Sequence, residues 1–333
     1  MSQIFRLATF NLENLDDRAG LDPPLDERLG ILRPQFERLA ADIVCLQEVN
    51  GQRESKEGPR RLKALDRLLE GSDYAGFHRA VASPTASKVA DKHNLVILSR
   101  WPITASRSLR HDLVPPPRLK SITADPPGSG EATVGWDRPV LHAEIELGNG
   151  RRLHVFNLHL RAPLAVPVAG QKESAHVWKS VSGWAEGYFL ASLKRDGQAL
   201  ETRLAVDRVF DAEPDALVVV AGDYNAETRQ TPVRLIRGDV EDTGNGRLAA
   251  RALVPLERNL PEGQRFSVLH AGQPVLLDHL LVSRTLLGWF RKAEIHNETL
   301  GDELVAQATI AHSPESTHAP VVAEFVLPPD NHP

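Results

Sequence analysis

Short apolar runs recur along this 333-residue chain, and turn residues or stretches with helical spacing separate them. Apolar runs of about four to eight residues between turn signals indicate buried β-strands. The expected strands cover residues 4–10, 42–48, 93–103, 139–147, 153–160, 216–223, 276–283 and 319–327. Gly148-Asn149-Gly150 separates two of these runs, which predicts an antiparallel hairpin.

Apolar positions at helical spacing predict helices between some of the strands. Residues 25–40 fit one helix, in which Pro34 predicts either a kink or a late start. Residues 59–71 fit a second, bounded by a proline and a glycine, and residues 171–211 have helical character.

The alternation of strands and helices favours an α/β layered sandwich. The sequence contains no internal repeat, charge tract or linker that divides it, so we expect one domain over residues 1–333. Variable insertions are expected at about 103–136, 161–200 and 226–264, where no motif is evident. Trp178 and Trp184 fall in the second insertion. They could stack on a base or face a lipid, although we expect at least one to pack in the core.

The composition, 41% hydrophobic and 25% charged, is ordinary for a soluble globular protein. A formal net charge of −5 argues against a broad basic surface for nucleic acid, but not against a local groove. The single cysteine, Cys45, excludes an internal disulfide and favours a reducing compartment. We find no signal peptide and no apolar run near the ~20 residues that cross a bilayer. A cytoplasmic protein without stable membrane insertion is therefore expected.

Carboxylates, amides and imidazoles lie at or close to the ends of the predicted strands. Ligands in α/β folds bind beyond the carboxyl ends of strands, so we expect these groups to share one edge. No serine or cysteine nucleophile lies beside a base among them, and their oxygen-rich chemistry suits Mg²⁺ or Mn²⁺ rather than zinc. The candidates are Asn11, Glu13, Glu48, His159, Asp223, Asn225, Asp278 and His318.

Seven motifs carry a resemblance to a known family. They are TFNLEN, DIVCLQEV, NLVILSRWPI, VFNLHL, VVAGDYN, LLDHLLVS and STHAPVVAEF, spread from about residue 4 to 326. Their order resembles that of the endonuclease/exonuclease/phosphatase superfamily, which includes deoxyribonuclease I-like nucleases. The resemblance implies a four-layer α/β sandwich of two packed, mixed or mostly antiparallel β-sheets flanked by helices. It also implies divalent-metal-dependent cleavage of a phosphate ester.

The resemblance also implies a role for each acid and amide. Glu48 resembles the main metal-binding carboxylate of the family, and Glu13 stands where some members carry a second acidic ligand. Asn11 resembles the amide that supports the site. Asp223 matches the carboxylate that orients or deprotonates the attacking water, and Asn225 its neighbouring amide.

The histidines and one arginine complete the implied site. His159 matches a residue that contacts the phosphate, and His318, oriented by Asp278, resembles the pair that steadies the transition state. Arg138 begins its strand, where a guanidinium would suit a phosphate, an ordinary surface ion pair being the alternative. Asn157 is expected to be structural.

One position departs from the family pattern. The family reads Ser-Asp-His where this chain reads Ser316-Thr317-His318, so one negative charge is missing. We therefore expect either weaker metal affinity or compensation by Glu13.

The leading prediction is a Mg²⁺- or Mn²⁺-dependent phosphodiesterase, with a nuclease as the first choice. A phosphatase of a phosphorylated small molecule or lipid headgroup is the alternative. A third possibility is a binding protein that kept the fold without turnover, which only Thr317 supports. The partner expected is a phosphate-ester substrate, with nucleic acid as one class, and no protein partner is inferred.

Overall fold

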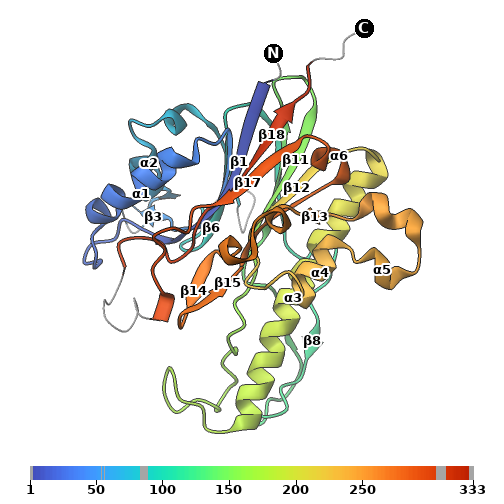
Figure 1. Cartoon of the computed structure of the whole chain (residues 1–333). Helices are drawn as coiled ribbons and strands as arrows, with labels where there is room; N and C mark the ends of the chain where they lie inside the picture. The colour runs from blue at the N-terminus through green and yellow to red at the C-terminus, as the bar shows by residue number, and fades with distance from the viewer. Residues whose placement is uncertain (1–2, 54, 56, 83–88, 305–312, 330–333) are drawn as a thin grey trace.

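Two six-stranded β-sheets pack face to face in this computed structural model, with helices on their outer faces (Figure 1). The structure describes residues 3–53, 55, 57–82, 89–304 and 313–329. In spatial order the first sheet contains β17 (Phe290–Ile295), β18 (Val321–Leu327), β1 (Gln3–Leu15), β2 (Ile43–Val49), β6 (Asn94–Ser99) and β5 (His78–Val81). The second contains β13 (Val254–Pro255), β16 (Asp278–Val282), β12 (Leu217–Asp223), β11 (Arg152–His159), β10 (Val140–Glu146) and β7 (Ile103–Leu109).

Both sheets are mixed but mostly antiparallel. Only β1 with β2, and β11 with β12, run parallel within them. The predicted hairpin of β10 and β11 is confirmed. The four-layer sandwich implied by the resemblance is therefore confirmed. Three two-stranded pairs lie outside these sheets: β3 (Gln52–Arg53) with β4 (Arg60–Arg61), β8 (Arg118–Leu119) with β9 (Ala132–Thr133), and β14 (Val268–His270) with β15 (Gln273–Val275).

Alternating side chains of the strands explain the layers, because successive residues of a strand point to opposite faces. Odd-numbered residues such as Phe5 and Leu7 of β1 face the second sheet, where Leu141 and Val155 meet them in a core between the sheets. Even-numbered residues of β1, such as Phe10, face outward onto helices.

The outer layers are built from two helices on the first sheet and a long helix with a shorter one on the second. α1 (Leu25–Leu39) and α2 (Lys63–Leu69) bury their apolar faces on the first sheet. α3 (Val181–Ala212) and α4 (Thr231–Arg237) cover the second. The short helices are α5 (Val240–Thr243) and α6 (Arg284–Leu287). Among the described residues, no helix combines the length and the apolar character needed to cross a membrane.

Some element boundaries differ from the expectations. α1 begins at Leu25, so the late start predicted from Pro34 is wrong; the proline lies inside the helix on its exposed side. α2 begins only at Lys63, because Arg60 and Arg61 pair with β3. Within the expected 103–136 insertion, Ile103–Leu109 form β7, an edge strand of the second sheet.

Candidate functional site

Asp223 lies at the end of β12 and is the centre of a buried polar cluster. Only 1% of its surface is exposed. Asn11 Nδ2 donates to its Oδ2 at 3.0 Å, and Asn225 donates from Nδ2 to Oδ2 at 3.1 Å and from its backbone to Oδ1 at 2.8 Å. The Nε2 atoms of His159 and His318 lie 3.3 and 4.0 Å from Oδ2. Four residues, three of them distant from Asp223 in sequence, therefore meet at one carboxylate.

Strand order explains this convergence. β11 and β12 are parallel neighbours, which places His159 directly beside Asp223. β16 runs antiparallel to β12, which places its first residue, Asp278, opposite Asp223. Gly222 permits the close approach of β12 to β11, since its φ is 142° and any Cβ there would lie 2.0 Å from the Leu158 carbonyl oxygen.

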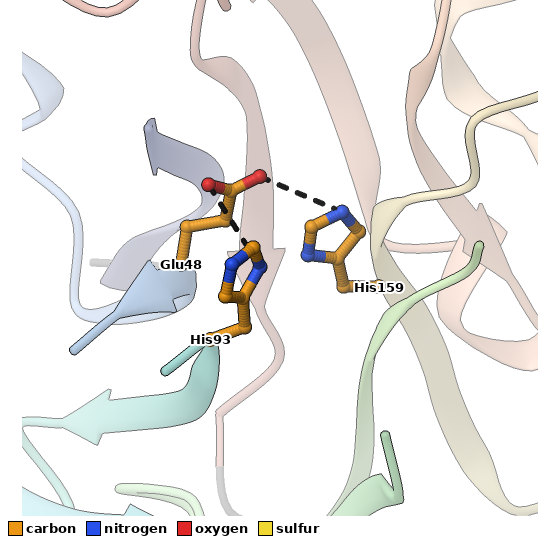
Figure 2. Close-up of side chains that lie close together, drawn as sticks. All are labelled: Glu48, His93 and His159. Atoms are coloured by element: carbon orange, nitrogen blue, oxygen red, sulfur yellow. Dashed lines mark ion pairs between the residues drawn. The ribbon is translucent and has the colours of Figure 1, made fainter. Parts of the chain in front are cut away.

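Glu48, near the end of β2, brings the first sheet into the same cluster. Asn11 donates to its Oε1 at 3.3 Å, and the backbone N–H of Asn14 donates to its Oε2 at 3.0 Å. Two imidazoles face the carboxylate: His159 Nε2 lies 3.7 Å from Oε1 and His93 Nδ1 3.9 Å from Oε2 (Figure 2). Asn11 bridges Glu48 and Asp223, so the acids of the two sheets share one amide.

The predicted pair of His318 and Asp278 is present. His318 Nδ1 lies 2.8 Å from Asp278 Oδ2, while its Nε2 faces Asp223. Burial opposes protonation of His318, but the charges of Asp278 and Asp223 outweigh it and raise the pKa of His318 to about 10. The ring is therefore an imidazolium at neutral pH, with one N–H held by Asp278 and the other directed at the cluster.

The remaining titratable groups shift as their surroundings dictate. Burial raises the pKa of Asp223 to about 7, against the opposing charge of His318. Burial and the charge of Arg138 lower the pKa of His159 well below its ordinary value, so this imidazole is neutral. Burial likewise lowers the pKa of His93.

Arg138 joins the cluster rather than forming the alternative surface ion pair. Its Nη2 lies 3.1 Å from His93 Nδ1, and its Nη1 donates to the carbonyl oxygens of His159 and Leu160 at 3.4 Å. Within the part of the chain that the structure describes, no carboxylate forms an ion pair with it. Its charge is thus available to an anion at the site.

Glu13 borders the cluster and is bound by the residue that departs from the family pattern. Its Oε2 accepts from the Thr317 backbone N–H at 2.7 Å and from the Thr317 hydroxyl at 2.9 Å. With Asn14 and Lys92 it also lines a cavity of about 330 Å³.

Backbone strain gathers at the same place. Glu13, Asn14, Glu48, His93 and Asn225 have φ angles of 44–58°, in the left-handed region that residues other than glycine seldom adopt. Such conformations cost about 1–3 kcal/mol each and concentrate at functional sites.

His93 belongs to the cluster but is not among the residues predicted from the sequence. Its position, just before a strand, is also that of an ordinary turn residue, and its link to Glu48 and Arg138 exists only in the folded chain. Asn157 is structural as predicted: its side-chain amide donates to the carbonyl oxygens of Leu46 and Val96 and so joins the two sheets.

The donor set fits a divalent cation. Glu48, His93 and His159 offer ligand atoms within 4.8 Å of one another, and so do Asp223, Asp278 and His318. The second group is already engaged internally by the Asp278–His318 hydrogen bond. His159 Nδ1 and Asp278 Oδ1 are buried without a hydrogen-bond partner among the described residues. Carboxylates suit Mg²⁺ or Mn²⁺, and the two imidazoles beside Glu48 widen the range toward other transition metals.

Comparisons with known proteins show what the chain as a whole is similar to. The profile of the Endonuclease/Exonuclease/phosphatase family matches residues 8–298. No curated protein gives a significant sequence match. Among solved structures, an endonuclease/exonuclease/phosphatase from Bacteroides vulgatus is similar, with 16% identity, coverage of 98% of this chain and 100% of that chain, and a TM-score of 0.56. Truncated TDP2 from Caenorhabditis elegans is similar at 15% identity, 97% coverage of both chains and a TM-score of 0.55. An AP endonuclease from Archaeoglobus fulgidus is similar at 14% identity, 96% and 99% coverage and a TM-score of 0.50.

Proposed function

The chain belongs to the endonuclease/exonuclease/phosphatase family, and on that premise we propose that it is a divalent-metal-dependent phosphodiesterase. The observation that supports this most is the convergence of Glu48, Asp223 and His318 through shared hydrogen bonds and close contacts. One buried cluster thus holds a candidate metal ligand, a candidate base and an imidazolium.

Glu48 would hold the metal ion. Both of its oxygens are fixed by hydrogen bonds from Asn11 and Asn14, so the carboxylate is oriented in advance. His159 and His93 stand close enough to add nitrogen ligands, and Glu13 is proposed as a second acid at the border. A bound Mg²⁺ or Mn²⁺ would offset the charge of the phosphate and stabilise the leaving oxygen.

Asp223 would accept the proton of the attacking water. General bases work best when their pKa lies near the working pH, and the pKa of this carboxyl is raised to about 7. Asn225 fixes its orientation, because the amide is itself anchored on the Leu160 carbonyl oxygen at 3.0 Å. A positioned base of this kind contributes about 10²–10⁴-fold to the rate.

The cations and the neutral imidazole would receive the phosphoryl oxygens. His318 donates from Nε2 to a non-bridging oxygen where charge accumulates, and Asp278 keeps it protonated and oriented. Arg138 offers two further N–H donors in a planar fork. His159 completes the surroundings of the phosphate between Glu48 and Asp223.

We propose nucleic acid as the substrate class, and a nuclease is therefore the leading hypothesis. The similar fold of an AP endonuclease supports this choice. Arg138 and Lys92 lie near the cluster and provide two cations for phosphate contacts, although the chain as a whole is acidic. Assays on DNA and on RNA distinguish which nucleic acid is cleaved, and the products distinguish internal from terminal cleavage.

Hydrolysis of bis-p-nitrophenyl phosphate by the full chain with Mn²⁺ tests the proposal. We expect turnover that EDTA abolishes and that His318→Ala reduces by about 10²-fold or more. His270→Ala, which changes an exposed histidine paired with Glu303, serves as the matched control and should keep full activity. Turnover that survives EDTA, or that is equal in both variants, contradicts the proposal. Release of inorganic phosphate from monoesters without cleavage of DNA or RNA identifies a phosphatase instead.

A further inference from the structure

The first turns of α3 present large apolar side chains to solvent. Val181 is 81% exposed, Trp184 44%, Tyr188 39% and Phe189 54%. At 100° per residue these four positions fall within one broad stripe of the helix, so they form a single surface, here called the α3 ridge. In Figure 1 this half of α3 extends past the ends of the two sheets, beside β8.

The inward face of the same turns carries only small residues. Gly183, Gly187 and Ala191 are buried, four residues apart. A Cβ on Gly187 would lie 2.3 Å from the Val166 carbonyl oxygen, so the loop backbone packs directly against the helix. The polarity of an ordinary surface helix is thus inverted, with large apolar groups outside and small ones inside.

This packing corrects the expectation that Trp178 or Trp184 fills the core. Trp178 is partly exposed and lies against Gly187, with Lys172 Nζ 4.5 Å above its ring. Trp184 faces solvent and packs beside Tyr188, with ring centroids 5.5 Å apart. At Gly183 and Gly187 the inward face of α3 has no room for an indole.

The ridge has almost no polar group of its own. Glu186 is the only charged residue between Val181 and Leu190, and its carboxylate is occupied by the backbone N–H groups of Ile122 and Thr123. A contiguous apolar surface of this kind on a soluble protein marks an interaction site.

Two lysines beside the ridge, Lys172 and Lys179, are the cations that a partner of the ridge would meet. Arg161 and Lys194 are both paired with Asp137 and are not available to a partner. Lys172 and Lys179 lie in the segment that leads into α3, and within the described residues neither forms an ion pair. Lysines beside exposed Trp, Tyr and aliphatic groups are typical of helices that lie in the headgroup region of an anionic bilayer.

We propose that the α3 ridge docks on an anionic phospholipid surface. A nucleic acid strand fits less well, because Val181, the most exposed member, offers no ring for a base to stack on. A second copy of the chain fits less well, because the flanking cations of two copies would approach each other. The ridge lies on the helix that also reaches the catalytic cluster, where Arg195 Nη1 donates to the Asn225 carbonyl oxygen at 3.4 Å. Docking would therefore hold the site close to the lipid surface.

Co-sedimentation of the full chain with vesicles tests this. We expect binding to vesicles of phosphatidylcholine with 30% phosphatidylglycerol (about one lipid in three, enough to give an anionic surface). Binding should weaken in pure phosphatidylcholine and in high salt. The triple variant Val181→Ser, Trp184→Ser, Phe189→Ser should bind these vesicles more weakly than the wild type by about tenfold or more. Leu248→Ser, which changes a leucine that is 39% exposed elsewhere, is the matched control and should bind normally.

The outcomes separate this inference from the proposed function. The triple variant should keep wild-type turnover of bis-p-nitrophenyl phosphate, and Asp223→Asn should bind vesicles normally. Absence of vesicle binding, or equal binding by the triple variant, overturns the inference. The inference is also overturned if light scattering shows a wild-type dimer that the triple variant does not form, and the wild type does not bind vesicles. Trp184-dependent fluorescence quenching by an oligonucleotide, without vesicle binding, overturns it in favour of nucleic acid.

Discussion

Replacing Asp278 with asparagine should remove a charge that keeps His318 protonated and leave the position of the imidazole unchanged. The asparagine keeps the shape of the side chain and an oxygen that can accept from His318 Nδ1, 2.8 Å away in the wild type. It removes a negative charge that, together with Asp223, raises the pKa of His318 to about 10 against the effect of burial. Asp278 is therefore a positioning residue whose main effect is to keep the imidazole protonated.

The size of the effect follows from the pKa. If the pKa of His318 returns to its ordinary value of about 6.5, the ring is ~90% protonated at pH 5.5 and ~1% at pH 8.5. The ratio of wild-type to variant kcat/KM should then rise from about 1 at pH 5.5 toward about 100 at pH 8.5, which corresponds to roughly 2.7 kcal/mol. Asp223 still attracts the proton in the variant, so a hundredfold loss is the upper limit.

The assay is kcat/KM for bis-p-nitrophenyl phosphate with Mg²⁺ at half-unit steps from pH 5.5 to 9. Asp42→Asn provides the control, since Asp42 is a buried carboxylate bonded to the Arg6 backbone, away from the cluster. Its profile should follow that of the wild type. A wild-type to Asp278→Asn ratio that stays constant with pH would refute the reasoning, because a merely structural loss does not depend on the protonation of His318.

The pair of His318 and Asp278 should also make the free energy of unfolding depend on pH. The pKa of His318 is raised on folding, so the native state holds this proton more tightly than the unfolded chain does. The resulting stabilisation is fully present below pH ~6.5 and is lost as the pH rises toward ~10. Urea unfolding should show a shallower decline over that range in Asp278→Asn than in the wild type.

Three further substitutions test separate parts of the account. Asp223→Asn should lower kcat by about 10²–10⁴-fold with an unchanged circular dichroism spectrum; full activity would remove Asp223 from the mechanism. Thr317→Asp should tighten Mg²⁺ binding by roughly tenfold in calorimetry, because the new carboxylate lies beside Glu13 and a bound cation relieves the repulsion between the two acids. An unchanged affinity would place Thr317 outside the metal environment. Phe325→Ala should cost about 3–5 kcal/mol in urea unfolding, because this buried ring stacks on Phe5 at 5.0 Å; a cost below 1 kcal/mol would contradict the packing.

The sheets and most of the site could be predicted from the sequence because the residue patterns that indicate them lie within a few consecutive positions. A buried strand is an apolar run, and a polar residue at its end is visible in the same few positions, as with Asp223 after Leu217–Ala221. Motif order then links the runs. This is why Asn11, Glu48, His159 and Asp223 were expected together, and the structure places them together.

What the sequence hid depends on contacts between distant segments. His93 faces Glu48 only because its backbone adopts a φ of 58°, which no periodicity reveals. The bond between Glu13 and Thr317 joins residues more than 300 positions apart. The inverted polarity of α3 was hidden for the same reason, since nothing in its own spacing shows that a loop backbone covers the Gly183–Gly187 face.

We propose that acids and imidazoles from both sheets surround a divalent cation at Glu48. Anomalous diffraction from crystals soaked in Mn²⁺ measures this directly. We expect a manganese peak in contact with the Glu48 carboxylate, on the side of His159 and Asp223, which Glu48→Gln removes. A peak elsewhere with none at Glu48, or a peak that persists unchanged in Glu48→Gln, would contradict it.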